Sequence, residues 1–136
     1  IYAEIAASDS HHAWVLELED RPLGLLQTYQ PHADPIGGAY LPRAGDLGMH
    51  LLLAPCERPV HGFSLEVMRS ILAYQFADPF ARRIVVEPDA RNTKVHALNR
   101  RVGFVYQCLL HLPEKDACLA FCTRAQFLAT LQENPQ

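Results

Sequence analysis

Short apolar runs separated by turn residues dominate the first half of the chain. Two such runs, at 13–19 and 23–29, flank the turn Asp20-Arg21-Pro22 and predict an antiparallel hairpin. The next stretch, 31–45, holds three Pro and three Gly, which indicates a long loop of the kind that often carries binding residues. A further apolar run then predicts a strand over 46–54, and a proline ends it.

Helical spacing first appears at residues 62–76. Apolar residues recur there on two adjoining faces, so we expect a largely buried helix. The β-branched run 83–87 is bounded by a proline and is typical of a central strand. Asn92 can cap a helix over 93–101, and Gly103 supplies the glycine that commonly follows a helix end.

Two strands and one helix complete the pattern. The strands are expected at 104–112 and 117–122, and the helix runs from a Thr123 cap to Leu131. The predicted order is β-β-β-α-β-α-β-β-α, with one strand–helix–strand crossover inside an otherwise antiparallel array. We therefore predict a single α+β domain over residues 1–136, built on a mixed, mostly antiparallel central sheet that is flanked by helices.

Composition excludes several classes of function. The 136 residues carry a net charge of −3 without a cluster of Lys or Arg, so no nucleic-acid partner is expected. No apolar run approaches the roughly 18 residues that a membrane span needs, so no membrane association is expected either. The four cysteines form no Cys-x-x-Cys pair and the histidines lack metal-like spacing, which favours buried thiols and no metal. The chain starts at Ile1 without a signal-peptide pattern, which favours a cytoplasmic protein whose natural N-terminal part is absent.

Two strand ends carry the polar residues best suited to chemistry. Gly48-Met49-His50 opens one apolar run, and the segment 86–92 has the pattern of a strand end, a Pro-Asp turn and a helix start. In open α/β sheets, ligands gather where strand ends meet helix N-termini. His50 is either a strand residue with a satisfied hydrogen bond or a general base, because imidazole accepts protons near neutrality. Asp89 is either a turn former or the partner of that base.

The segments around these residues resemble a known family. Pro88-Asp89-Ala90-Arg91-Asn92, followed by Arg101-Val102-Gly103-Phe104, looks like the second half of a GNAT acyltransferase. Val60-His61-Gly62-Phe63-Ser64 resembles the loop with which those enzymes bind the pyrophosphate of acyl-CoA. The resemblance covers roughly residues 13 to 122, and the family's opening strand and two helices have no match in residues 1–12. N-terminal elements of the fold are therefore expected to be missing.

One branch of the family is the most similar. Gly48-Met49-His50-Leu51 together with the segment 87–92 resembles the siderophore-biosynthesis acyltransferases, which acylate N-hydroxylated lysine, ornithine or diamines during hydroxamate siderophore assembly. The resemblance implies His50 and Asp89 as the catalytic pair. This sequence differs from the family pattern at two positions. Pro59 supplies no N–H to the loop, and Asn99 stands where many members carry a tyrosine that acts as general acid.

The resemblance also implies a binding site for the donor and one for the acceptor. Backbone N–H groups of the strand at 50–54 and of the helix start would hold acetyl-CoA or another acyl-CoA. The residues expected to bind the donor are Leu52, Ala54, Val60, His61, Gly62, Phe63, Ser64, Asn92 and Asn99. Asn92 is expected to cap the helix, and the same residue can also contact the donor. Three aromatic residues either line the acceptor pocket or only pack: Trp14, Tyr29 and Tyr40.

The function expected from these features is acyl transfer from acyl-CoA to the nitrogen of a small-molecule amine or hydroxylamine, without a covalent enzyme intermediate. An N-hydroxylated amine of siderophore biosynthesis is the preferred acceptor. One alternative is a GNAT enzyme that acts on another amine, such as an aminoglycoside or a protein N-terminus. The other is a non-catalytic acyl-CoA-binding or partner-binding module. The sequence does not define an oligomeric state.

Overall fold

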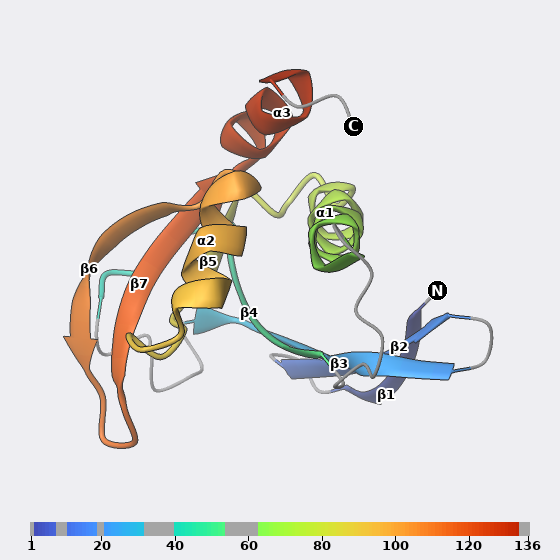
Figure 1. Cartoon of the computed structure of the whole chain (residues 1–136), viewed down its shortest axis with the longest axis horizontal. Helices are drawn as coiled ribbons and strands as arrows, with labels where there is room; N and C mark the ends of the chain where they lie inside the picture. The colour runs from blue at the N-terminus through green and yellow to red at the C-terminus, as the bar shows by residue number, and fades with distance from the viewer. Residues whose placement is uncertain (1, 8–10, 19–20, 32–39, 54–62, 134–136) are drawn as a thin grey trace.

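The fold was examined in a computed structural model that describes residues 2–7, 11–18, 21–31, 40–53 and 63–133 (Figure 1). The elements in chain order are β1 (Tyr2–Ala7), β2 (His11–Leu18), β3 (Arg21–Tyr29), β4 (Asp46–Leu53), α1 (Phe63–Phe76), β5 (Arg83–Val86), α2 (Thr93–Arg101), β6 (Val105–His111), β7 (Asp116–Thr123) and α3 (Arg124–Glu133). The predicted order is confirmed from β2 onward, and β1 precedes it.

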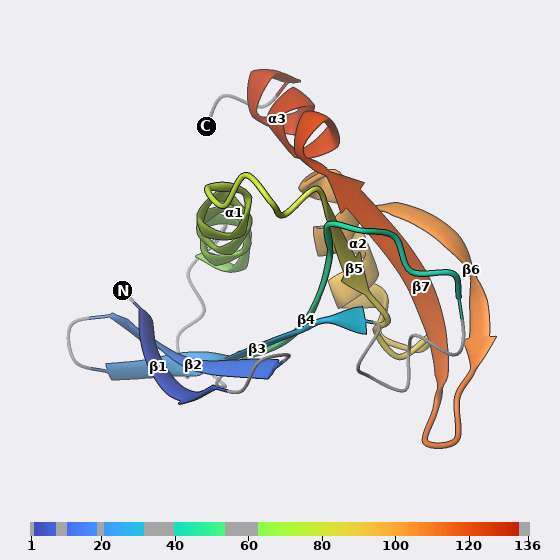
Figure 2. The ribbon, with the colours of Figure 1, turned by 180° about the vertical axis from the view of Figure 1, so that it is seen from behind.

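The strands form a seven-stranded sheet in the order β1-β2-β3-β4-β5-β7-β6. Among the described strands, only β4 and β5 pair in parallel, so the predicted mixed, mostly antiparallel α+β sheet is confirmed. Figures 1 and 2 show the sheet bending between its two halves, with α1 and α2 on the inner side of the bend. No helix of the described residues is long and apolar enough to cross a membrane.

The strand β1 is the element that the sequence pattern did not identify. Residues 2–7 read Tyr-Ala-Glu-Ile-Ala-Ala, and alanine is depleted in strands, so local propensity gives little signal. The segment is a strand because it pairs with β2, with a register shift between Glu4 and Ala6. This is a tertiary contact rather than a local preference.

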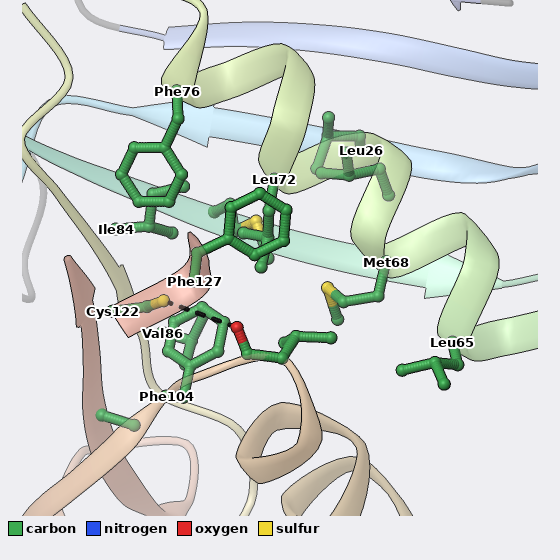
Figure 3. Packing of buried hydrophobic residues seen from close by; sticks show 14 of the residues in the cluster. Leu26, Leu65, Met68, Leu72, Phe76, Ile84, Val86, Phe104, Cys122 and Phe127 are labelled. Atoms are coloured by element: carbon green, nitrogen blue, oxygen red, sulfur yellow. Dashed lines mark hydrogen bonds between the residues drawn. The ribbon is translucent and has the colours of Figure 1, made fainter. Parts of the chain in front are cut away.

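Helix α1 supplies one wall of the hydrophobic core. Its apolar spacing places Leu65, Met68, Ile71, Leu72 and Phe76 in buried positions, in agreement with the predicted, largely buried helix. These side chains meet buried residues of six other elements and of the α2–β6 connection (Figure 3): Leu16, Leu26, Met49, Ile84, Val86, Val102, Phe104, Ala120, Cys122 and Phe127. The core therefore ties α1 and α3 to the inner side of the sheet.

Local hydrogen bonds fix the helix ends where the sequence predicted them. The side chain of Asn92 accepts from the Val95 N–H at 3.3 Å and caps α2. Gly103 has φ of +112°, and a Cβ there would lie 2.8 Å from the Gln126 carbonyl oxygen, so only glycine fits without strain. At α3, Thr123 and Gln126 bond reciprocally, side chain to backbone, in a capping box.

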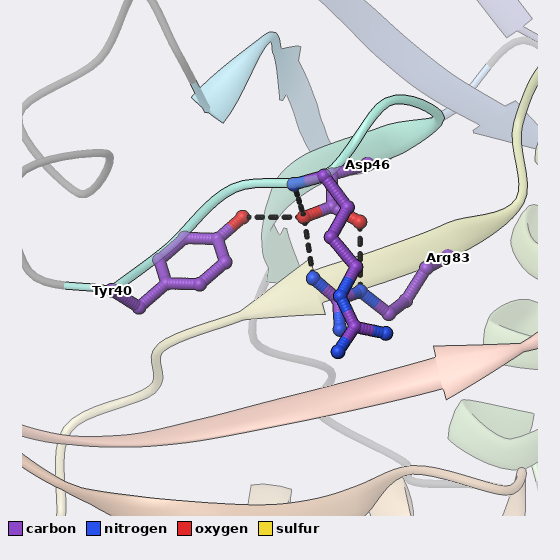
Figure 4. Close-up of polar contacts among 4 residues, drawn as sticks. Tyr40, Asp46 and Arg83 are labelled. Carbon is purple, nitrogen blue, oxygen red and sulfur yellow. Dashed lines mark hydrogen bonds and ion pairs between the residues drawn. The ribbon is translucent and has the colours of Figure 1, made fainter.

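A buried ion pair joins β4 to β5 at the start of their parallel ladder (Figure 4). The Arg83 guanidinium donates to both Asp46 carboxylate oxygens, each at 2.7 Å, and the Tyr40 hydroxyl adds a third hydrogen bond at 2.9 Å. Burial alone would raise the pKa of Asp46, but the hydrogen bonds from Arg83, the Arg43 N–H and Tyr40 hold it below its usual value. The same burial and the Asp46 carboxylate raise the pKa of Tyr40, which therefore stays protonated.

We predict that Arg83→Met destabilises the fold by about 3–5 kcal/mol, because it leaves the Asp46 carboxylate buried and unpaired. Urea unfolding at neutral pH measures this loss, and the loss should shrink below about pH 4, where the carboxylate can take up a proton. The exposed neighbour provides the control, since Arg82→Met should change stability by no more than about 0.5 kcal/mol. Equal stabilities of the two variants would contradict the role given to this pair.

Candidate active site

The site begins where β4 and β5 separate. The two strands pair only through Asp46↔Arg83, Leu47↔Ile84 and Gly48↔Val85. Beyond Gly48, β4 stays paired with β3 on its other side as far as Leu53, whereas β5 ends at Val86 and the chain follows β7. One edge of β4 therefore has no strand partner among the described residues, and its backbone groups are open to a ligand.

A pocket of about 640 Å³ occupies this opening. Its volume lies within the range of roughly 300–1,000 Å³ that is common for small-molecule sites. It is lined by Gln27, Met49, His50, Leu51, Leu52, Met68, Val86, Glu87, Pro88, Asp89, Asn92, Lys94, Val95, Leu98, Asn99 and Lys115. The lining mixes an apolar wall with a few charged and amide side chains, so the pocket can hold an apolar arm and orient a polar group.

The strand register explains why both faces of the sheet contribute to this lining. Met49 and Val86 belong to the core face that α1 covers. Side chains alternate along a strand, so His50 and Glu87 lie on the opposite face. Since β4 and β5 diverge at this level, residues of both faces reach the same opening.

Glu87 is the buried charged group of the site. Its side chain is 5% exposed, and a carboxylate with so little solvent needs hydrogen-bonding partners. The Tyr29 hydroxyl donates to its Oε2 at 2.6 Å, and the His50 Nε2 contacts its Oε1. The rings of Tyr29 and His50 lie 5.0 Å apart between centroids. The three residues come from β3, from β4 and from the position directly after β5, and they form one connected group.

Gly48 makes this group sterically possible. It pairs with Tyr29 across the β3–β4 ladder, and the tyrosine ring crosses over it toward Glu87. A Cβ at position 48 would lie 2.1 Å from the Tyr29 Cε2 atom, closer than any real contact. A strand glycine of this kind marks a close approach of another group.

Asp89 lines the same pocket, but its carboxylate pairs with Arg91 rather than with His50. The hydrogen bonds from the Arg91 side chain and backbone N–H lower the pKa of Asp89 to about 2. A carboxylate that ionises so readily is a weak proton acceptor near neutral pH. The expected contact between His50 and Asp89 is thus replaced by one between His50 and Glu87.

The two predicted asparagines differ in their surroundings. Asn92 is exposed at the pocket and serves as the cap of α2, as described above. Asn99 is buried and donates through Nδ2 to the Tyr106 hydroxyl at 3.1 Å. His96 Nδ1 lies 2.7 Å from the same hydroxyl. Burial raises the pKa of Tyr106, so this hydroxyl stays protonated beside the pocket wall.

The remaining donor-site residues are only partly described. Leu52 lines the pocket and is exposed. Ser64 lies exposed in the first turn of α1, because the helix begins at Phe63. The described residues do not include Ala54, Val60, His61 and Gly62, nor the side chain of Phe63.

The three predicted acceptor aromatics do not gather at the pocket. Trp14 pairs with Leu26 on the core face and packs edge-on against Tyr74 of α1, with ring centroids 5.7 Å apart. Tyr40 packs on Phe121 and bonds Asp46 at the far end of β4. Tyr29 reaches the site through Glu87 and is itself buried. Of the three, Tyr29 is the one with a hydrogen bond to a residue of the pocket lining, Glu87.

Glu87 is the site residue that the sequence interpretation missed. A signal was present: an acidic residue directly follows the β-branched run Arg83-Ile84-Val85-Val86 of a central strand. A charge at the end of a buried strand requires a partner, which makes it a candidate for function. Among the described residues there is no group of three or more metal-ligating side chains.

Comparison with known proteins places this geometry in a family. The acetyltransferase (GNAT) domain matches residues 1–112. The chain belongs to the GNAT acetyltransferase family.

Two curated relatives are similar over much of this GNAT domain. An N-hydroxyputrescine acetyltransferase from Acinetobacter baumannii is 27% identical over 128 residues, which are 93% of this chain and 61% of that protein. The lysine N-acyltransferase MbtK from Mycobacterium tuberculosis is 36% identical over 81 residues, which are 59% of this chain and 39% of that protein. The chain spans less than two thirds of the length of either relative.

Solved structures confirm the predicted GNAT-like fold. An uncharacterised protein from Bacillus halodurans has a TM-score of 0.85 at 27% identity, and the match covers 93% of this chain and 65% of that one. The aminoglycoside acetyltransferase AAC(6′)-Ib, solved with coenzyme A and kanamycin, has a TM-score of 0.73 at 21% identity. That match covers 94% of this chain and 73% of the neighbour.

We predict that Gly48→Ala costs about 1–3 kcal/mol of stability, because the new methyl group must displace the Tyr29 ring. Urea unfolding checks this value. In a Tyr29→Ala background the ring is gone, so the same substitution should cost much less, and the double-mutant cycle isolates the steric coupling. An equal cost of Gly48→Ala in both backgrounds would contradict this explanation.

Proposed function

We propose that this GNAT domain is an acyl-CoA-dependent N-acyltransferase that acylates an N-hydroxylated amine, as in hydroxamate siderophore biosynthesis. The observation that carries the proposal is the half-exposed imidazole of His50 in the pocket between β4 and β5, next to the open edge of β4. The family assignment supports acyl transfer, and the similarity to an N-hydroxyputrescine acetyltransferase supports the acceptor class.

The open edge of β4 would hold the donor. Acetyl-CoA or another acyl-CoA carries a pantetheine arm with amide groups, and such groups can bond to an unpaired strand edge as an added strand does. Backbone N–H groups on the edge beyond His50 would polarise the thioester carbonyl. The apolar wall around Met49, Leu51 and Met68 suits the acyl group.

His50 would act as the general base. The acceptor nitrogen attacks the thioester carbon, its proton passes to the imidazole, and the tetrahedral intermediate collapses with release of CoA thiolate. Asp89 stays ionised and would stabilise the positive charge that develops on the attacking nitrogen. No covalent bond to the protein is needed in this sequence of steps.

A non-catalytic acyl-CoA-binding module is the second candidate. The observation in its favour is Asn99, which places an amide where many GNAT enzymes have a tyrosine acid and which is engaged with Tyr106. A thiol with a pKa of about 8.5 can leave without prior protonation, so the missing hydroxyl does not forbid turnover. Measurement of thiol release with and without an acceptor distinguishes the two candidates.

We predict that His50→Ala lowers kcat by roughly 10²–10⁴, the usual range for a general base, with a smaller change in the affinity for acyl-CoA. Thiol release measures the rate, and calorimetry measures the affinity. His111→Ala is the matched control, because this imidazole is 77% exposed at the end of β6 and should leave the rate unchanged. Wild-type turnover in His50→Ala would assign the base to another residue.

We predict a preference for hydroxylated acceptors. An N-hydroxylamine has a much lower pKa than the parent alkylamine, so it is uncharged at neutral pH and needs less proton removal before attack. A pocket that binds the added hydroxyl also rejects the analogue that lacks it. The ratio of kcat/KM for N-hydroxyputrescine, N-hydroxylysine and N-hydroxyornithine to their parent amines tests this. Ratios near one, or a preference for plain amines or for kanamycin, would remove the siderophore assignment and leave the fold unaffected.

A further inference from the structure

We propose that Glu87, held by Tyr29, positions His50 so that Nε2 faces the carboxylate and Nδ1 is the nitrogen that takes the acceptor's proton. The inference rests on the proposed function and names the nitrogen and the partner that this function requires. Glu87 is a positioning residue in this scheme, because it acts through the imidazole rather than on the substrate.

An ionised Glu87 in the pocket can satisfy both of its neighbours. The Tyr29 hydroxyl approaches Oε2, and His50 Nε2 approaches Oε1, so each carboxylate oxygen faces one neighbour. A hydroxyl donates to a carboxylate oxygen, and an ionised carboxylate can accept from an imidazole N–H at the same time. A protonated Glu87 would instead have to donate from one of these oxygens.

The position of the imidazole proton follows from this arrangement. With an ionised carboxylate at Oε1, neutral His50 carries its hydrogen on Nε2 and leaves the Nδ1 lone pair vacant. No described residue forms a hydrogen bond with Nδ1. When Nδ1 takes a proton, the resulting imidazolium keeps its Nε2 hydrogen bond and gains charge stabilisation from Glu87.

Other charged groups also line the pocket, so the experiments must distinguish their effect on His50 from the effect of Glu87. Asp89 lies on the segment after β5, Lys94 on α2 and Lys115 just before β7, and all three line the pocket with His50. On the β3 side the neighbours are Tyr29 and the neutral Gln27. Asp89 pairs with Arg91, so Glu87 is the carboxylate in contact with the imidazole.

The first test needs no substrate and no activity. Two-bond proton–nitrogen correlation spectra of the ¹⁵N-labelled full chain report the tautomer of each neutral histidine, and comparison with His50→Ala assigns the signal. We expect the Nε2–H tautomer in the wild type. The Nδ1–H tautomer would overturn the inference.

The second test is the titration of His50 in Glu87→Gln, followed in the same spectra. Loss of the negative charge should move the midpoint down by roughly one pH unit or more. Asp89→Asn is the matched comparison, because it removes a carboxylate from the same pocket without removing a contact to the imidazole, and its shift should be smaller. Equal midpoints in the wild type and Glu87→Gln would overturn the inference.

Kinetics separate this inference from the proposed function. In Glu87→Gln, kcat should fall at least about tenfold and the acidic limb of the kcat/KM profile should move to lower pH, which a purely structural role would not produce. Glu114→Gln, in the exposed turn between β6 and β7, is the control and should behave as the wild type. An active wild type with an inactive His50→Ala and an unshifted Glu87→Gln profile would sink the positioning role alone. A wild type that releases no thiol with any acceptor would sink the proposed function instead.

Discussion

The length of the parallel ladder between β4 and β5 is the constraint on which the site depends. Three residue pairs join the strands. In the first pair, the side chains of Asp46 and Arg83 also form an ion pair with two hydrogen bonds. A longer ladder would close the opening that becomes the pocket. A one-residue slip of β5 along β4 would turn Glu87 to the core face and away from His50, because side chains alternate along each strand. The ion pair lies outside the pocket, yet it joins the two strands at the start of the ladder that ends at the pocket.

The two faces of the sheet carry different kinds of side chain. The face under α1 carries the apolar core, while the opposite face carries Tyr29, Gly48, His50 and Glu87. A buried carboxylate is costly, and two hydrogen-bonding neighbours offset that cost only if their positions are fixed. Gly48 supplies the space, and the β3–β4 register supplies the position. The polar group therefore relies on backbone pairing rather than on loops.

Local signals predicted much of the fold. The helix-end signals depend on residues close together in sequence, so the sequence shows them directly. They are the N-cap at Asn92, Gly103 after α2 and the capping box of Thr123 with Gln126. The strand β1 was missed because its alanines carry no strand preference and only its pairing with β2 defines it.

The site was predicted less completely than the fold, for a related reason. Which carboxylate meets His50 depends on the register between strands far apart in sequence, and no spacing rule distinguishes Glu87 from Asp89. The aromatic residues show the same limit. Trp14 and Tyr40 suit an acceptor pocket by residue type, but the alternation of β2 and the bond to Asp46 place them elsewhere.

The strand order also has a consequence for synthesis. The match to the family ends at residue 112, yet β7, over Asp116–Thr123, lies between β5 and β6 in the sheet. Until β7 has left the ribosome, β5 has an open edge and β6 has no neighbour to pair with. A nascent chain stalled at Leu112 would therefore expose unpaired strand edges, which favour association between chains. Completion of the sheet during synthesis therefore depends on residues 116–123, although the catalytic candidates have emerged before them.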